Sequence, residues 1–269
     1  MGYQHVQIDV ADHVGWLWLD RPEKLNAMSS DMWADIPSAM AELDADDAVR
    51  AIVVAGRGRS FTVGIDLAML AELEPEGASE AARRTNLYRR IKQLQKTMSA
   101  FADSPKPVIA AVHGHCIGAG IDLISACDIR VASADAVFSV RETRMGLVAD
   151  VGTMQRLPRL IPPGHLAEMV YTGKDIDASE AERIGLTNRT LPDAESLIEH
   201  AAELAGSIAA NSPLVVQGAK QVLRAEAGMS TDEALDHMAL WNASFLWSND
   251  LREAMAAFIE KRDPDFTGT

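Results

Sequence analysis

The sequence predicts an α/β protein, because short apolar runs alternate with longer segments of helical spacing. Residues 51–55 and 107–112 have the length and the small or β-branched composition of buried strands. Turns that contain glycine follow both runs. From about residue 193 the pattern changes to alanine-rich helix almost to the end. We therefore expect an α/β core over residues 1–195 and a helical region over residues 196–269.

The composition restricts the classes of function. With 269 residues, 48% of them hydrophobic, the chain can bury a large core. Its formal net charge of -14 argues against binding to nucleic acid, which requires a basic face. An anionic ligand must therefore meet a local basic patch. Both cysteines, Cys116 and Cys127, lie among small apolar residues, which favours buried free thiols over a disulfide.

The two ends of the chain and the lengths of its apolar runs bear on its location. The N-terminal residues resemble neither a secretory signal nor a mitochondrial presequence, and the last three residues are not the peroxisomal tripeptide. No apolar run approaches the roughly 18 residues that span a bilayer. We therefore expect a soluble cytoplasmic protein with no membrane partner.

The first elements can be placed from periodicity. Residues 6–10 and 14–19 alternate like two strands of a hairpin. A helix is expected over residues 29–43, with Ser30 or Asp31 as its N-cap, although Pro37 argues against its continuity. After the strand at 51–55, a long polar helix is expected over residues 79–102; its arginines and lysines are typical of a solvated face.

Later elements follow the same logic. Short strands are expected at 128–132, 137–140 and 186–191, and helical segments at 153–160 and 164–172. Breaks at 212–213, 228 and 248–249 divide the C-terminal helical region. Its last helix carries Leu251, Met255 and Phe258 on a face with little to cover within one chain, which indicates a subunit contact.

Two glycine turns indicate a site that stabilises negative charge on an oxygen. The strand at 107–112 leads through glycines into an apolar helix at 118–126, and residues 61–67 repeat that arrangement. The first amides of a helix have no internal partner and lie at the positive end of its dipole. Two such turns can supply the two N–H donors of an oxyanion hole.

Other chemistries lack their motifs. Residues 56–61 do not complete a dinucleotide fingerprint, since Phe61 occupies the place of the third glycine, and the chain has no phosphate loop or serine-hydrolase elbow. His113 and His115 are not joined by further ligands, so no metal site is expected. Asp122, within an apolar helix, is either a desolvated acid with a raised pKa or an acid on an exposed helix edge. Glu142 and Asp150, each considered alone, are typical of surface acids.

Four motifs in order resemble the enoyl-CoA hydratase/isomerase (crotonase) superfamily. They are FTVGIDL at 61–67, KPVIAAVHG at 106–114, GAGIDLISACDIR at 118–130 and GTMQRLP at 152–158. The resemblance extends over nearly the whole chain. It implies the crotonase fold, with a repeated ββα spiral core and a C-terminal helical region used in trimerisation. It also implies acyl-CoA thioester substrates, homotrimers or hexamers built as dimers of trimers, and no cofactor other than the coenzyme A of the substrate.

The resemblance assigns residues to roles. The oxyanion-hole donors would be the backbone N–H groups of Ile65 and Ala119, although the family usually has glycine at the second position. A lysine common three residues after the first donor is replaced by Ala68. The residues that resemble coenzyme A contacts are Arg21, Lys24, Ala27, Phe258 and Lys261, the last two often reaching a neighbouring subunit.

Three acids distinguish activities within the superfamily. Asp122 and Glu142 align with the two catalytic acids of hydratases, which usually carry Glu at the first place. Asp150 stands where hydratases usually have glycine, and a third acid there is similar to the Δ3,5-Δ2,4-dienoyl-CoA isomerases. This similarity implies that Glu142 removes a proton from C2 and Asp150 delivers one near C6, with Asp122 tuning Glu142.

Alternative functions remain open from the sequence. A 2-enoyl-CoA hydratase would use Asp122 and Glu142 to bind a water, with Asp150 shaping the pocket. A non-catalytic CoA-binding or RNA-binding homologue, a thioester hydrolase and a dehalogenase are further alternatives. The acidic charge argues against RNA, and the intact set of acids argues against loss of catalysis.

Overall fold

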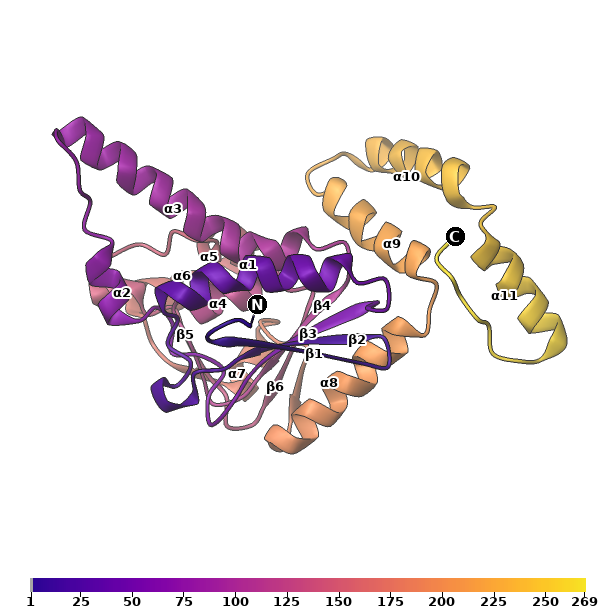
Figure 1. Cartoon of the computed structure of the whole chain (residues 1–269), viewed down its shortest axis with the longest axis horizontal. Helices are drawn as coiled ribbons and strands as arrows, with labels where there is room; N and C mark the ends of the chain where they lie inside the picture. The colour runs from indigo at the N-terminus through magenta and orange to yellow at the C-terminus, as the bar shows by residue number, and fades with distance from the viewer. Residues whose placement is uncertain (1) are drawn as a thin grey trace.

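A computed structural model describes residues 2–269 and has the expected α/β architecture (Figure 1). Its main sheet has six strands in the order β1-β2-β3-β4-β6-β9. The strands are β1 (Val6–Ala11), β2 (Val14–Leu19), β3 (Ala51–Gly56), β4 (Val108–Val112), β6 (Ile129–Ser133) and β9 (Arg189–Leu191). β1 and β2 form the predicted antiparallel hairpin, and the strands from β2 to β9 run parallel.

A smaller sheet places the two glycine turns side by side. It contains β5 (His115–Ile117), β7 (Val137–Ser139) and β8 (Ile176–Asp177). Isolated bridges extend it, because Thr62 pairs with Cys116 and Met28 pairs with Ile65. The segments that contain Gly64 and Gly118 are therefore neighbours, although 54 residues of sequence separate them.

Helices cover both faces of the main sheet. On one face lie α1 (Ser30–Ala45), α3 (Glu80–Asp103) and α4 (Ala119–Ala126), and on the other lies α8 (Ala194–Ala209) (Figure 1). In β3, Ile52 and Val54 face the first layer, while Val53 faces α8. Since successive strand residues point to opposite faces, a strand covered on both sides must be apolar throughout, as residues 51–55 are.

Shorter helices connect these layers, and one expected segment is divided. They are η1 (Pro22–Lys24), α2 (Leu67–Glu72), η2 (Glu142–Met145), α5 (Thr153–Arg156), η3 (Leu157–Arg159), α6 (Pro163–Thr172) and α7 (Ala178–Arg183). The helix expected over 153–160 is therefore two short helices. Pro158 cannot donate a backbone hydrogen bond, so the chain tightens into a 3₁₀ turn there.

The helix expected over 29–43 is present as α1, but its expected N-cap was wrong. Its N-cap is Ser29, whose hydroxyl accepts from the N–H of Met32, and not Ser30 or Asp31. Pro37 does not interrupt the helix. A proline within a helix leaves the carbonyl four residues earlier without its donor. Here that carbonyl belongs to Trp33, and the Thr97 hydroxyl of α3 donates to it at 2.9 Å.

The C-terminal helices are divided at the predicted breaks. They are α9 (Pro213–Ala225), α10 (Thr231–Phe245) and α11 (Asn249–Glu260), each preceded by a serine N-cap. Figure 1 shows these three helices as a group beside the sheet, whereas α8 packs against it. The division at residue 195 stays a prediction. Within residues 2–269, no helix is both long and apolar enough to cross a membrane.

Candidate active site

The two glycine turns and all three acids line one pocket of about 380 Å³. Gly64, Ile65, Gly118 and Ala119 form one part of its wall. Much of the remaining wall is apolar. Helices α1, α2 and α3 contribute Trp33, Leu67, Leu70, Leu87, Ile91 and Leu94, and η2 with the segment after it contributes Met145, Leu147, Ala149 and Val151. An apolar pocket with a few converging polar groups is the usual form of a small-molecule site.

Two backbone N–H groups in this wall have no partner among residues 2–269. Ile65 lies in a parallel bridge in which the N–H of Met28 donates to Gly64 O and the N–H of Asp66 donates to Met28 O. The N–H of Ile65 therefore faces away from Met28 and donates no hydrogen bond within the described chain. Ala119 is the first residue of α4, and its N–H likewise donates to no described residue.

The glycines bring these donors close together. Gly64 has a φ of +90°, and a Cβ built on it would lie 3.4 Å from Ala119 N and 2.7 Å from Ile117 O. Gly118 has a φ of +55°, in the left-handed region that glycine adopts at little cost. Both predicted donors thus lie in the wall of one pocket, the arrangement that stabilises a developing oxyanion.

Asp122 is buried, so the structure decides between the two interpretations of this acid. Its side chain is 1% exposed within α4, and Oδ1 accepts a hydrogen bond from the N–H of Thr153 at 2.5 Å. Burial raises the pKa of Asp122 to about 6, because desolvation disfavours the charged form more than this hydrogen bond favours it. Asp122 is therefore a desolvated acid.

Glu142 is the first residue of η2 and lies against the glycine turn. A Cβ built on Gly118 would be 3.4 Å from Glu142 Oε1. Its other oxygen, Oε2, is buried and accepts no hydrogen bond from residues 2–269. Burial, followed by the negative charge of Asp122, raises the pKa of Glu142 to about 7. A carboxylate with such a pKa can accept and release protons near neutral pH.

Asp150 lies at the rim of the same pocket. Its side chain is exposed there. Partial desolvation nevertheless raises the pKa of this carboxyl above its usual range. Its backbone carbonyl accepts a hydrogen bond from Gln95 Nε2 of α3 at 2.7 Å. The sequence indicated the acid but not this contact, because 55 residues separate the two partners.

Arg21, predicted to contact coenzyme A, is bound to the protein beside the first donor. Its Nη1 donates to Ala27 O at 3.0 Å and to Asp66 Oδ2 at 2.5 Å. This hydrogen bond lowers the pKa of Asp66, which also caps α2 through the N–H of Ala68. Arg21 therefore fixes the turn that contains Ile65, a function that the sequence did not indicate. A role in coenzyme A binding for Arg21, Lys24 and Ala27 stays a prediction.

Phe258 and Lys261 do not line the pocket of their own chain. They lie at the end of α11, at the opposite end of the molecule from α2 (Figure 1). The Phe258 side chain is 85% exposed. The assignment of these two residues to coenzyme A contact stays a prediction.

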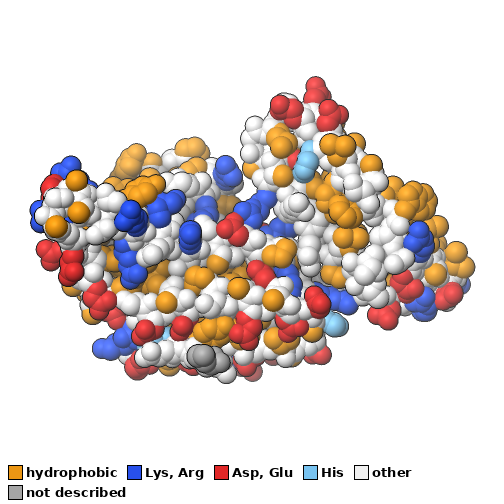
Figure 2. All heavy atoms as spheres, turned by 45° about the horizontal axis from the view of Figure 1, so that its top comes forward, with side chains coloured by type: hydrophobic (Ala, Val, Ile, Leu, Met, Phe, Trp, Pro, Cys, Tyr) orange, Lys and Arg blue, Asp and Glu red, His pale blue; other side chains and the backbone are white. Residues whose placement is uncertain are grey.

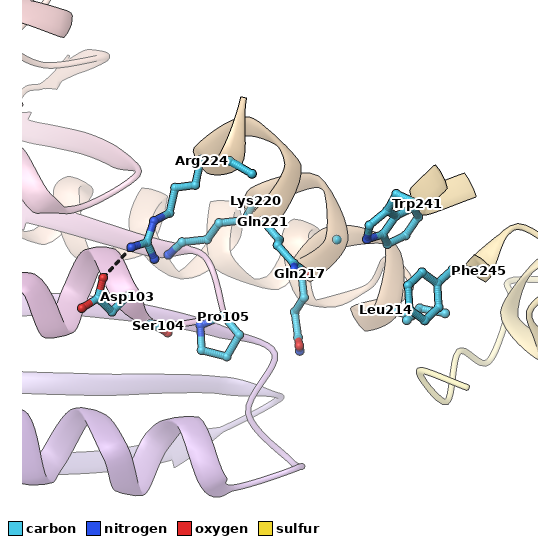
Figure 3. A pocket seen from close by; sticks show the side chains of 12 residues that line it. Asp103, Ser104, Pro105, Leu214, Gln217, Lys220, Gln221, Arg224, Trp241 and Phe245 are labelled. Carbon is cyan, nitrogen blue, oxygen red and sulfur yellow. Dashed lines mark hydrogen bonds and ion pairs between the residues drawn. The ribbon is translucent and has the colours of Figure 1, made fainter. Parts of the chain in front are cut away.

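A second pocket, of about 620 Å³, lies between the end of α3 and helices α9 and α10 (Figure 3). Its cations are already paired. Lys220 Nζ donates to Lys106 O at 2.8 Å and to Asp128 Oδ2 at 2.6 Å, and Arg224 pairs with Asp103. These contacts attach α9 to the core. We interpret this pocket as a packing gap between α9, α10 and the core. The pocket at the glycine turns is the candidate active site.

Other sequence candidates have structural roles. Cys116 and Cys127 are buried free thiols, as expected. His113 is buried, and its Nε2 lies 2.9 Å from the carbonyl oxygen of Gly58. On α3, Arg83 and Arg84 both pair with Glu80 at the exposed surface, so they belong to a solvated face.

Comparisons with known proteins agree with this geometry. The model of the enoyl-CoA hydratase/isomerase family matches residues 10–269. The mitochondrial Δ3,5-Δ2,4-dienoyl-CoA isomerase of Rattus norvegicus is 43% identical over 97% of this chain and 81% of its own length. The peroxisomal isomerase of the same name from Arabidopsis thaliana is 40% identical over 93% of this chain and 91% of its own. The solved enoyl-CoA hydratase of Bacillus anthracis has a TM-score of 0.89 and 30% identity, and the match covers 99% of this chain and 100% of that one.

These findings confirm the fold that the sequence motifs implied, and they correct one expectation. The cytoplasmic location was wrong, because the matched isomerases are mitochondrial and peroxisomal. That expectation depended on the residues at the two ends of the chain. The absence of a recognised targeting pattern in these residues therefore does not establish a compartment.

Proposed function

The chain belongs to the enoyl-CoA hydratase/isomerase family, and we propose that it converts 3,5-dienoyl-CoA thioesters to 2,4-dienoyl-CoA thioesters. The observation that carries this proposal is the third acid. Asp150 lies at the rim of a pocket that already contains Asp122 and Glu142. Identities of 40% and 43% to proteins named for this isomerisation support it, against 34% for a curated crotonyl-CoA hydratase of Syntrophomonas wolfei.

The first step is proton abstraction beside the thioester. Glu142, ionised, takes a proton from C2 of the acyl chain, and the electron pair of that C–H bond moves into a dienolate. Negative charge then develops on the thioester oxygen. The N–H groups of Ile65 and Ala119 donate to that oxygen, and their fixed positions make this stabilisation available without reorganisation.

The second step returns a proton at the far end of the conjugated system. Asp150, protonated, gives its proton to C6, the electrons of the dienolate shift toward C6, and the double bonds come to rest at C2 and C4. Glu142 then holds one proton more and Asp150 one fewer than at the start. Proton exchange between the two acids, through solvent at the rim, restores both.

The acids are suited to these roles by their surroundings. An acyl chain in the pocket would exclude water from Asp150, which keeps its pKa raised and favours the protonated form. Asp122 raises the pKa of Glu142 and remains fixed by the N–H of Thr153. Because C2 and C6 are far apart along the chain, two separate carboxyl groups serve them better than one.

We further propose that the active assembly is a homotrimer or a dimer of such trimers. Figure 2 shows hydrophobic side chains gathered over the C-terminal helices, at the right of the view. On α10, on α11 and in the turn between them, Leu240, Trp247, Phe258 and Ile259 are each at least 71% exposed. Burying such a face against another copy would stabilise the assembly. Light scattering of the purified protein measures the subunit number; a monomer would contradict this proposal.

One assay tests the activity. The purified protein is given a 3,5-dienoyl-CoA, and the ultraviolet absorbance of the conjugated 2,4-diene is followed. Asp150→Asn should reduce diene formation by roughly 10²- to 10⁴-fold, the usual effect of removing a proton-transfer group. A 2-enoyl-CoA tests the alternative. Rapid hydration without isomerisation would show a hydratase that uses Asp122 and Glu142. An Asp150→Asn variant that forms diene as fast as the original would show that Asp150 is not the proton donor.

A further inference from the structure

One segment, residues 150–156, connects two of the three acids and is attached to helix α3. Asp150 lies at its start, and the N–H of Thr153 donates to Asp122. Two half-buried side chains one turn apart on α3, Gln95 and Ser99, contact this segment. The position of Asp150 therefore depends on how α3 holds the segment.

The contact at Ser99 restricts the middle of the segment. Arg156 Nη2 donates to Ser99 Oγ at 2.9 Å, and Nη1 donates to Val151 O at 3.3 Å. Gly152 has a φ of +146°, and a Cβ built on it would lie 1.7 Å from Arg156 Nη1. The guanidinium thus occupies the space beside the backbone at Gly152 and leaves the segment little freedom.

The contact at Gln95 restricts the start of the segment. Lys92 Nζ donates to Gln95 Oε1 at 2.8 Å, and Gln95 Nε2 donates to Asp150 O at 2.7 Å. An ammonium can only donate, so it selects the oxygen of the Gln95 amide. The amide nitrogen must then face the carbonyl of Asp150. The orientation of Gln95 is therefore determined by its neighbours.

The carboxylate of Asp150 has no comparable support. Among residues 2–269 no side chain hydrogen-bonds this carboxylate, and Gln95 contacts the backbone carbonyl of Asp150. Its place over the acyl pocket is consequently set by the backbone of residue 150, and Gln95 is the side chain that holds that backbone.

We propose that Gln95 is a positioning residue that places the carboxyl group of Asp150 for proton delivery to C6. This inference rests on the proposed isomerase activity. A proton donor on a rim loop must stay within hydrogen-bonding reach of a carbon that is remote from the thioester. Small displacements of a reacting group have large effects on rate, so a single backbone hydrogen bond can control this step.

The test uses Gln95→Leu, which keeps an apolar side chain of similar volume and removes the hydrogen-bond donor. Gln93→Leu is the matched control, because Gln93 is exposed on the same helix. With 3,5-dienoyl-CoA in D₂O, Gln95→Leu should form diene about 10- to 100-fold more slowly. Deuterium should still enter C2 of the remaining substrate at the original rate, because Glu142 and the two N–H donors are unchanged, and KM should change little. Gln93→Leu should match the original protein in every respect.

If Gln95→Leu loses C2 exchange and diene formation in parallel, Gln95 has a general structural role and the inference is overturned. An unchanged rate of diene formation in Gln95→Leu would overturn it too, because Gln95 would then not affect proton delivery. Amide hydrogen exchange supplies a second measurement that needs no substrate. Residues 147–152 should exchange faster in Gln95→Leu than in Gln93→Leu, and equal exchange would also overturn the inference. If the original protein forms no diene, the proposed function fails, while amide exchange still decides whether Gln95 holds the segment.

Discussion

Glu142, the base of the proposed mechanism, should destabilise the fold at neutral and alkaline pH. Burial and neighbouring charge raise the pKa of Glu142 from 4.5 to about 7. One pKa unit corresponds to about 1.4 kcal/mol, so ionising Glu142 in the folded protein costs about 3 to 4 kcal/mol more than in the unfolded chain. Glu142→Gln replaces the carboxylate with a neutral group of the same shape. Above pH 7 the variant should therefore be more stable than the original protein by about that amount.

The sign of the pH dependence follows from the raised pKa. Between pH 4.5 and about 7 the folded protein binds a proton at Glu142 more tightly than the unfolded chain does, so this contribution to stability falls as pH rises through that range. Below pH 4.5 both states are protonated, and the advantage of Glu142→Gln should disappear.

Thermal unfolding at equal protein concentration measures the difference. For a chain of this size, about 3 to 4 kcal/mol corresponds to a rise in Tm of roughly 6 to 16 °C. The measurement is made at pH 8 and again near pH 4.5, with Glu203→Gln on the exposed face of α8 as the control. Equal stability of Glu142→Gln and the original protein at pH 8, or a difference that persists at pH 4.5, would refute the reasoning.

Two further predictions concern the reaction. The rate of diene formation should fall about tenfold for each pH unit below 7, because Glu142 must be ionised to take the C2 proton. A rate that stays constant from pH 5 to pH 8 would contradict the role of Glu142 as the base. Gly64→Ala should reduce kcat by about 10²- to 10³-fold with a smaller change in KM, since the new Cβ would lie 2.7 Å from Ile117 O and displace the N–H of Ile65. Steady-state kinetics measures kcat and KM. An unchanged kcat would show that the N–H of Ile65 does not contact the oxyanion.

Local pattern predicted much of the architecture. The β-branched run at 51–55 is buried on both faces because it is β3 of the main sheet, and that burial is the reason for its apolar composition. The breaks at 212–213, 228 and 248–249 were predicted because proline, glycine and N-cap serines act locally. Local sequence did not show why α1 tolerates Pro37, because the donor that satisfies Trp33 O is Thr97 on another helix.

The sequence by itself determined the chemical groups of this site: two glycine turns with backbone N–H donors and three acids in motifs that resemble one superfamily. These features depend on residue type and local spacing, which sequence records directly. Only the tertiary structure decided that Asp122 is buried, that Arg21 holds the oxyanion turn through Asp66, and that Gln95 holds Asp150. The partners in the last two pairs are 45 and 55 residues apart. Contacts across such separations depend on how layers of helices and strands pack, and so does the desolvation that raises the pKa values of the three acids.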